Sequence, residues 1–156
     1  MSRLNPFKTL QKIHSTMLAG MVVFCVVSAI VRLPNKMAAY PNLNRVLQVT
    51  VLAVTFILIK TGLSVFNRKL QRIPPMATPV EKLDIYRIAA IIKWVMIEVP
   101  VLLAVVSFMM TRNYAFIALA FALIIFFAFQ GPVRLKIMQQ LQLSETEFRQ
   151  LEGVSD

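Results

Sequence analysis

Long apolar runs divide the chain into four segments, at residues 13–31, 47–66, 88–110 and 114–133. About 20 apolar residues in a helix cross the hydrocarbon core of a bilayer. Backbone groups in lipid must be hydrogen-bonded within their own segment, so each run predicts a transmembrane helix. The fourth run reaches this length only if it continues beyond Phe129 to Val133. The pattern predicts an all-α, polytopic four-helix membrane bundle that forms a single domain over residues 1–156.

Basic residues are concentrated on one side of the predicted membrane. Eleven of the 17 lie in the N-terminal segment, the middle loop and the tail: Arg3, Lys8, Lys12, Arg68, Lys69, Arg72, Lys82, Arg87, Arg134, Lys136 and Arg149. Four lie in the two other loops. Loops rich in lysine and arginine stay cytoplasmic, which places both termini in the cytoplasm. We therefore expect a multi-pass protein of the cell inner, or plasma, membrane.

The composition supports this assignment and excludes several chemistries. Hydrophobic residues make up 58% of the chain and charged residues 15%, yet the net charge is +10. The basic flanks are suited to anionic lipid headgroups, and we expect no nucleic-acid partner. One cysteine and one histidine exclude an intrachain disulfide, a bis-histidine haem and a multi-histidine zinc centre. No phosphate-binding glycine loop occurs, so we expect no cofactor and no enzymatic activity.

Capping signals locate two helix starts outside the apolar runs. Thr78-Pro79-Val80-Glu81 is a capping box that begins the third helix about two turns before the membrane. Ser144 and Glu147 form a second capping box, which begins a short helix that should stop at Gly153. The tail at 134–156 is amphipathic, so it is either an interfacial helix on the headgroups or a docking element for a partner.

Three charged residues fall inside apolar runs: Lys60, Lys93 and Glu98. Lys60 and Lys93 are only about 10 Å from the cytoplasmic edge by residue count, so we expect both ammonium groups to extend to the interface. The neighbouring Trp94 supports a position of Lys93 near the interface, because indole rings favour that region of the membrane. Glu98 is about 16 Å deep, close to the bilayer midplane, where a carboxylate must be protonated or paired. These residues are the candidate ion-pair or proton site.

Lys60 is the favoured partner of Glu98, because it lies on the adjacent helix, roughly 6 Å nearer the surface by residue count, and its side chain is long. Lys93 is five residues away on the same helix and faces elsewhere. Pro100 follows closely and removes one helical hydrogen bond, which predicts a kink next to the carboxyl group. His14 at the start of the first helix is expected to be an interfacial polar residue, and the alternative is that it shares a proton with the Glu98 region. The pairs Thr16/Gly20 and Ala118/Ala122 are spaced for close helix contact.

The C-terminal half resembles a type of four-helix bacterial inner-membrane protein with no agreed activity. The resemblance rests on Tyr86-Arg87, Ile91-Ile92-Lys93, Ile97-Glu98, Asn113, Gly131-Pro132 and Leu141-Gln142-Leu143. It implies the fold and the compartment only. Small multidrug carriers place their glutamate in the first helix, which has no acid here. Rotary-ring proteolipids need glycine-rich helices, and this chain has four glycines.

Two functions are compatible with these features. The first is a non-catalytic accessory or interaction subunit of a membrane complex, acting with other membrane subunits or as a homo-oligomer. The alternative is a small proton- or cation-coupled carrier or channel centred on Glu98. An intramembrane carboxyl group is the usual mark of such a pathway, but no second acid accompanies it.

Overall fold

The computed structural model describes residues 6–32, 41–74 and 76–152. All regular structure within these ranges is helical, which confirms the all-α prediction. Six helices follow one another: α1 Pro6–Arg32, α2 Pro41–Gln71, α3 Pro79–Thr111, α4 Tyr114–Ala128, α5 Arg134–Leu141 and α6 Glu145–Glu152. The helices α1, α2 and α3 are long and apolar enough to cross a membrane, and α4 is a shorter apolar helix. These features indicate a multi-pass membrane protein.

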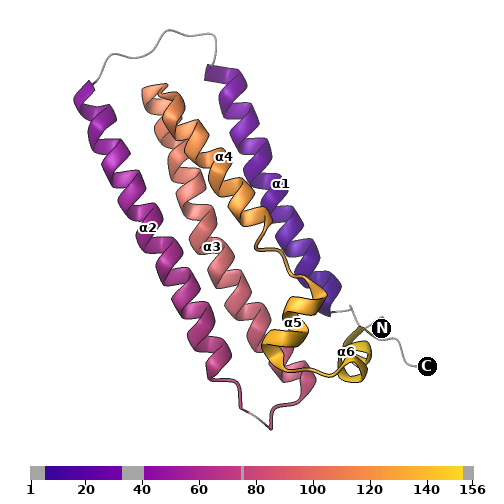
Figure 1. The fold of residues 1–156 in the computed structure, drawn as a ribbon. Helices are drawn as coiled ribbons and strands as arrows, with labels where there is room; N and C mark the ends of the chain where they lie inside the picture. Colours follow the sequence, from indigo (N-terminus) through magenta and orange to yellow (C-terminus); the bar gives the residue numbers. More distant parts are fainter. Residues whose placement is uncertain (1–5, 33–40, 75, 153–156) are drawn as a thin grey trace.

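The helix α3 lies at the centre of the arrangement. It packs against α2 over most of its length, and also against α4 and α1 (Figure 1). The helix α1 packs on α4 as well, whereas α1 and α2 make no extensive contact in the described part of the chain. The bundle is therefore open around α3, and one side of this central helix is left uncovered by its neighbours.

The first three helices extend beyond the apolar runs, and for α3 the capping signal at Thr78 predicts this early start. The Thr78 amide donates to the Glu81 carboxylate at 2.9 Å, and the Glu81 amide donates to the Thr78 hydroxyl at 3.4 Å. Both halves of the capping box are thus formed. The helix α3 then continues through the buried Pro100 to Thr111. The kink expected at this proline stays a prediction.

The fourth helix is shorter than the sequence pattern predicts. It ends at Ala128 rather than at Val133. The last amides form tight turns, with Gln130 N donating to Phe127 O at 2.9 Å and Gly131 N to Ala128 O at 3.4 Å. Pro132 has no amide hydrogen and disfavours helix in the residue before it, so the helix cannot continue. At 15 residues, α4 is about 22 Å long, less than the roughly 30 Å of a hydrocarbon core.

The tail folds back onto the end of the bundle. The helix α6 packs on α1 and α3, and α5 packs on α3. The Phe148 side chain is fully buried, and its ring contacts Phe7 edge-to-face at 5.5 Å. The tail therefore buries part of its apolar face inside the chain, and its placement on headgroups or against a partner stays a prediction. Gly153, the expected end of α6, lies outside the described residues.

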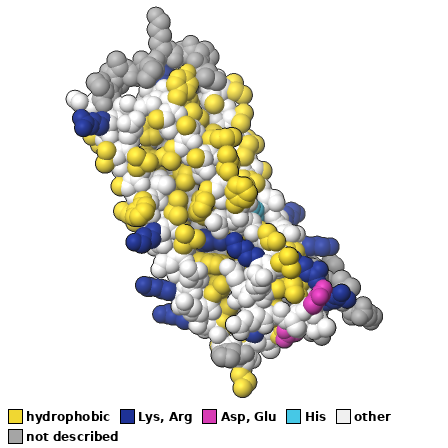
Figure 2. Space-filling view, viewed as in Figure 1, with side chains coloured by type: hydrophobic (Ala, Val, Ile, Leu, Met, Phe, Trp, Pro, Cys, Tyr) yellow, Lys and Arg dark blue, Asp and Glu magenta, His cyan; other side chains and the backbone are white. Residues whose placement is uncertain are grey.

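Apolar and basic side chains occupy different levels of the molecule. Figure 2 shows apolar side chains over the upper part of this face and most of the basic ones below, around the lower half of α2 and the α5–α6 region. The start of α1, the α2–α3 turn and the tail all lie at this lower end (Figure 1). The segments in which the sequence concentrates its basic residues are thus brought together in space.

One glycine sets the approach of α2 to α3. A Cβ atom added to Gly62 would lie 2.8 Å from the Met96 Cβ, so the two helices pack here without a side chain between them. The small residues that the sequence pattern selects are elsewhere. A Cβ atom on Gly20 would meet nothing within 4 Å, and Ala118 and Ala122 are exposed. The four-residue spacing of small residues therefore did not identify the close contact between α2 and α3 at Gly62.

Candidate functional site

The carbonyl end of α4 is the point where polar side chains from three parts of the chain meet. The last carbonyl groups of a helix have no partner within it and need one elsewhere. His14 Nε2 on α1 donates to the Phe127 carbonyl at 3.2 Å. Trp94 Nε1 on α3 donates to the Gln130 carbonyl at 3.1 Å. Side chains of α1 and α3 thus complete the hydrogen bonding where α4 stops.

Lys93 is buried at the same place. Its side chain is 4% exposed, and its ammonium group donates to Gln130 Oε1 at 3.2 Å. The ammonium nitrogen also lies 4.3 Å from the centre of the Phe66 ring, a favourable cation–π distance. The carbonyl end of a helix carries partial negative charge, which stabilises a nearby cation. The structure therefore corrects the expectation that Lys93 extends to the surface.

His14 is also buried rather than interfacial. Its ring stacks on Phe127 with centroids 4.6 Å apart and lies 4.9 Å from the Trp94 ring. A Cβ atom on Gly131 would lie 3.2 Å from His14 Cε1, so the absence of a side chain at Gly131 allows the ring to approach. His14, Lys93, Trp94, Phe127 and Gln130 are called the α4-end cluster below.

The α4-end cluster has the character of a structural joint. The donors of His14 and Trp94 are committed to backbone carbonyls, and Lys93 is committed to an amide oxygen and an aromatic face. Nothing in this geometry aligns a nucleophile with a base. The described residues also contain no group of three or more histidine, cysteine, aspartate or glutamate side chains able to hold a metal ion.

Lys60 and Glu98 lie at the same level of the molecule. The antiparallel helices α2 and α3 are in a constant register, in which Gly62 faces Met96 and Asn44 Oδ1 accepts from Asn113 Nδ2 at 2.8 Å. Lys60 is two residues before Gly62 and Glu98 is two residues after Met96, so in this antiparallel register the two are level with each other. Even so, no ion pair joins them within the described ranges. Lys60 is exposed and lies 5.8 Å from the Phe56 ring centre, and the extension of its ammonium group to the interface stays a prediction.

The direction of the two side chains explains why they do not meet. Each is two residues from the Gly62–Met96 contact, a rotation of about 200° that turns it away from the facing helix. Glu98 is one turn beyond Trp94, whose ring contacts His14, so it lies towards the α1 side of α3. The sequence predicted a Lys60–Glu98 pair, but the helix faces separate the two side chains.

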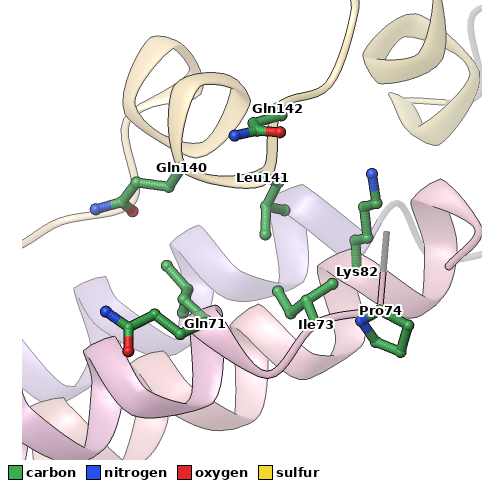
Figure 3. Close-up of a pocket in the computed structure, with 8 residues that line it drawn as sticks. Gln71, Ile73, Pro74, Lys82, Gln140, Leu141 and Gln142 are labelled. Carbon is green, nitrogen blue, oxygen red and sulfur yellow. The ribbon is translucent and has the colours of Figure 1, made fainter. Parts of the chain in front are cut away.

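A separate cavity of about 260 Å³ lies at the lower end, between the α2–α3 turn and α5. Figure 3 shows Leu141 directed towards Ile73, with the Gln140 and Gln142 side chains on either side of it. Lys82 and Gln71 add polar groups to the wall. The Gln140 Oε1 atom is buried without a hydrogen-bond partner among the residues that the structure describes. The cavity combines an apolar base with amide and ammonium groups, and none of its described lining residues carries a carboxylate or a thiol.

The chain matches no protein-family model, no curated protein and no solved structure.

Proposed function

We propose that this protein is a multi-pass membrane protein that acts as a non-catalytic interaction subunit, and that both of its termini are cytoplasmic. The open arrangement around α3 is the observation that carries the proposal. The helices α1 and α2 each cover one side of α3 but not each other, and much of their apolar surface remains exposed. Such surfaces are available to other membrane helices as well as to lipid.

The α4-end cluster supports insertion of all four apolar helices. A helix of about 22 Å ends inside a hydrocarbon core of about 30 Å if its other end is at the opposite surface. Non-helical backbone is tolerated at that depth only where protein supplies its hydrogen bonds. Trp94 does so for Gln130, which follows α4, and His14 bonds the Phe127 carbonyl in the last turn of the helix. The basic lower end is then on the cytoplasmic side of an inner or plasma membrane.

Photocrosslinking tests the interaction role directly. A photoreactive amino acid replaces Val49 or Ile57, which are 65% and 59% exposed on α2, in chains expressed in native membranes. Val101, which is fully buried, provides the matched control position. We expect discrete protein adducts from the two exposed positions and none from the control. Adducts with lipid alone at every exposed position contradict an interaction subunit.

A carrier centred on Glu98 is the second candidate. It is favoured by one observation, that Glu98 has no hydrogen-bond or ion-pair partner among the residues the structure describes. Proton flux into proteoliposomes, driven by a pH gradient, distinguishes the two functions. A carrier predicts flux in the wild type and its loss in Glu98→Gln, whereas an interaction subunit predicts no protein-dependent flux in either.

A further inference from the structure

The side of α3 opposite α4 carries a continuous exposed apolar stripe. Val95, Val99, Leu102 and Val106 follow one another at helical spacing and are each 38–43% exposed. We call these four residues the open side of α3. Glu98 borders it, because Val95 and Leu102 lie three residues before and four residues after the glutamate. A partly buried carboxyl group thus lies beside an uncovered apolar surface.

The outer face of α2 carries the complementary charge. Val49, Leu52, Phe56 and Ile57 are 56–68% exposed there, and Lys60 is exposed next to them. Within one chain, Lys60 and Glu98 point to different sides and make no ion pair. Glu98 therefore adds a negative charge to the border of the open side of α3, and Lys60 adds a positive charge to the apolar outer face of α2.

We infer that these two surfaces bind each other between copies of the chain, so that Lys60 of one copy pairs with Glu98 of the next. The inference rests on the proposed membrane insertion. Copies inserted in the same direction lie at the same depth, so residues that are level within one copy are level between copies. Two charges that are costly separately in an apolar environment then neutralise each other. A contact between two different surfaces generates a ring or a chain of copies.

Cysteine crosslinking tests this contact while both charges stay in place. In a Cys25→Ala background, Phe56→Cys and Leu102→Cys lie one turn from Lys60 and Glu98, respectively, and are level with each other by the same register. The two single-cysteine chains are co-expressed, oxidised in the membrane and separated by size. We expect a covalent heterodimer. Pairing Phe56→Cys with Met110→Cys, two turns further along α3, gives little or none.

Charge variants then ask whether the ion pair holds the copies together. Lys60→Met or Glu98→Gln, made in both chains, should lower the heterodimer yield about tenfold, as expected for a coupled pair. The exchange Lys60→Glu with Glu98→Lys should restore it. Intrinsic fluorescence of the single tryptophan, Trp94, verifies that each variant is folded. An unchanged yield in the charge variants overturns the proposal, and so does the absence of heterodimer in folded protein.

These outcomes are separable from the proposed function. In one outcome, α2 forms photocrosslinks to proteins that differ in size from this chain, and no cysteine heterodimer appears. This result supports an interaction subunit and overturns self-association. Failure of the interaction role appears instead as lipid adducts alone at Val49 and Ile57.

Discussion

The ammonium group of Lys93 donates to the side-chain oxygen of Gln130 at 3.2 Å, and this contact joins α3 to the segment that follows α4. The same glutamine offers its backbone carbonyl to Trp94. Gln130, two residues after the end of α4, thus accepts hydrogen bonds from two consecutive residues of α3. These bonds add to the apolar packing of α4 on α3 and α1.

Gln130→Leu should destabilise the protein more than Lys93→Met. The leucine leaves a buried ammonium group without its hydrogen-bond acceptor, at a cost of about 1.5–3 kcal/mol. The methionine keeps an apolar stem against Phe66 but removes the charge, so its cost should be smaller. The free energy of unfolding in mixed micelles, followed by Trp94 fluorescence, measures both. Equal costs contradict a role for Gln130 as the acceptor for Lys93.

Substitutions at His14 should separate stacking from hydrogen bonding. His14→Phe keeps a ring against Phe127 and loses one donor, for an expected cost of about 1 kcal/mol. His14→Ala also removes the ring and leaves a cavity, for an expected cost of about 3 kcal/mol. The same unfolding measurement tests the order. If His14→Ala is neutral, the histidine does not support the end of α4.

Gly62→Ala should weaken the packing of α2 on α3. The added methyl group would overlap Met96, and overpacking of this kind costs about 1–3 kcal/mol. Gly20→Ala is the matched control, because its methyl group would meet nothing within 4 Å. Alanine is the better helix former, so this control should be neutral or stabilising by up to about 1 kcal/mol. Thermal unfolding of the two variants, measured side by side, tests this difference. Equal destabilisation by Gly62→Ala and Gly20→Ala contradicts a close contact between α2 and α3 at Gly62.

Acidification should loosen α6. The Ser144 backbone amide, and then its hydroxyl group, hydrogen-bond the Glu147 carboxylate and lower its pKa below the ordinary value. A lowered folded-state pKa stabilises the helix above the pKa of the unfolded chain. This contribution is lost as the pH falls through the folded value.

Amide hydrogen exchange in α6, corrected for the intrinsic rate, measures this loss between neutral and acidic pH. Glu147→Gln retains a capping side chain without a titrating group, so the pH dependence of protection should become weaker. An identical pH profile in this variant would show that another group is responsible.

Several features of the fold were predictable because they depend on local chemistry. Capping boxes at Thr78 and Ser144 satisfy amides a few residues away, and both are formed. Apolar runs reflect the average environment of a helix, and they identified the four apolar helices. The end of α4 was harder to place. The apolar run continues to Phe129, beyond the last helical residue Ala128, and Gly131-Pro132 interrupts the helix only after that.

The residues of the candidate site could not be predicted, because they depend on which helix faces pack against each other. Helical rotation turns Lys60 and Glu98 away from the α2–α3 contact, although their depths agree. His14, Lys93 and Gln130 are distant in sequence, and no motif links the three of them.

The amino-acid pattern was sufficient for the helical class, the apolar segments, the helix caps and the distribution of charge, because each arises from neighbours along the chain. The partners of the buried polar groups came from the packing of α1, α3 and α4, which brings side chains from distant positions to the open end of one short helix. Hydrogen bonds of that kind depend on distance and direction in space, and hydrophobic spacing along a chain records neither.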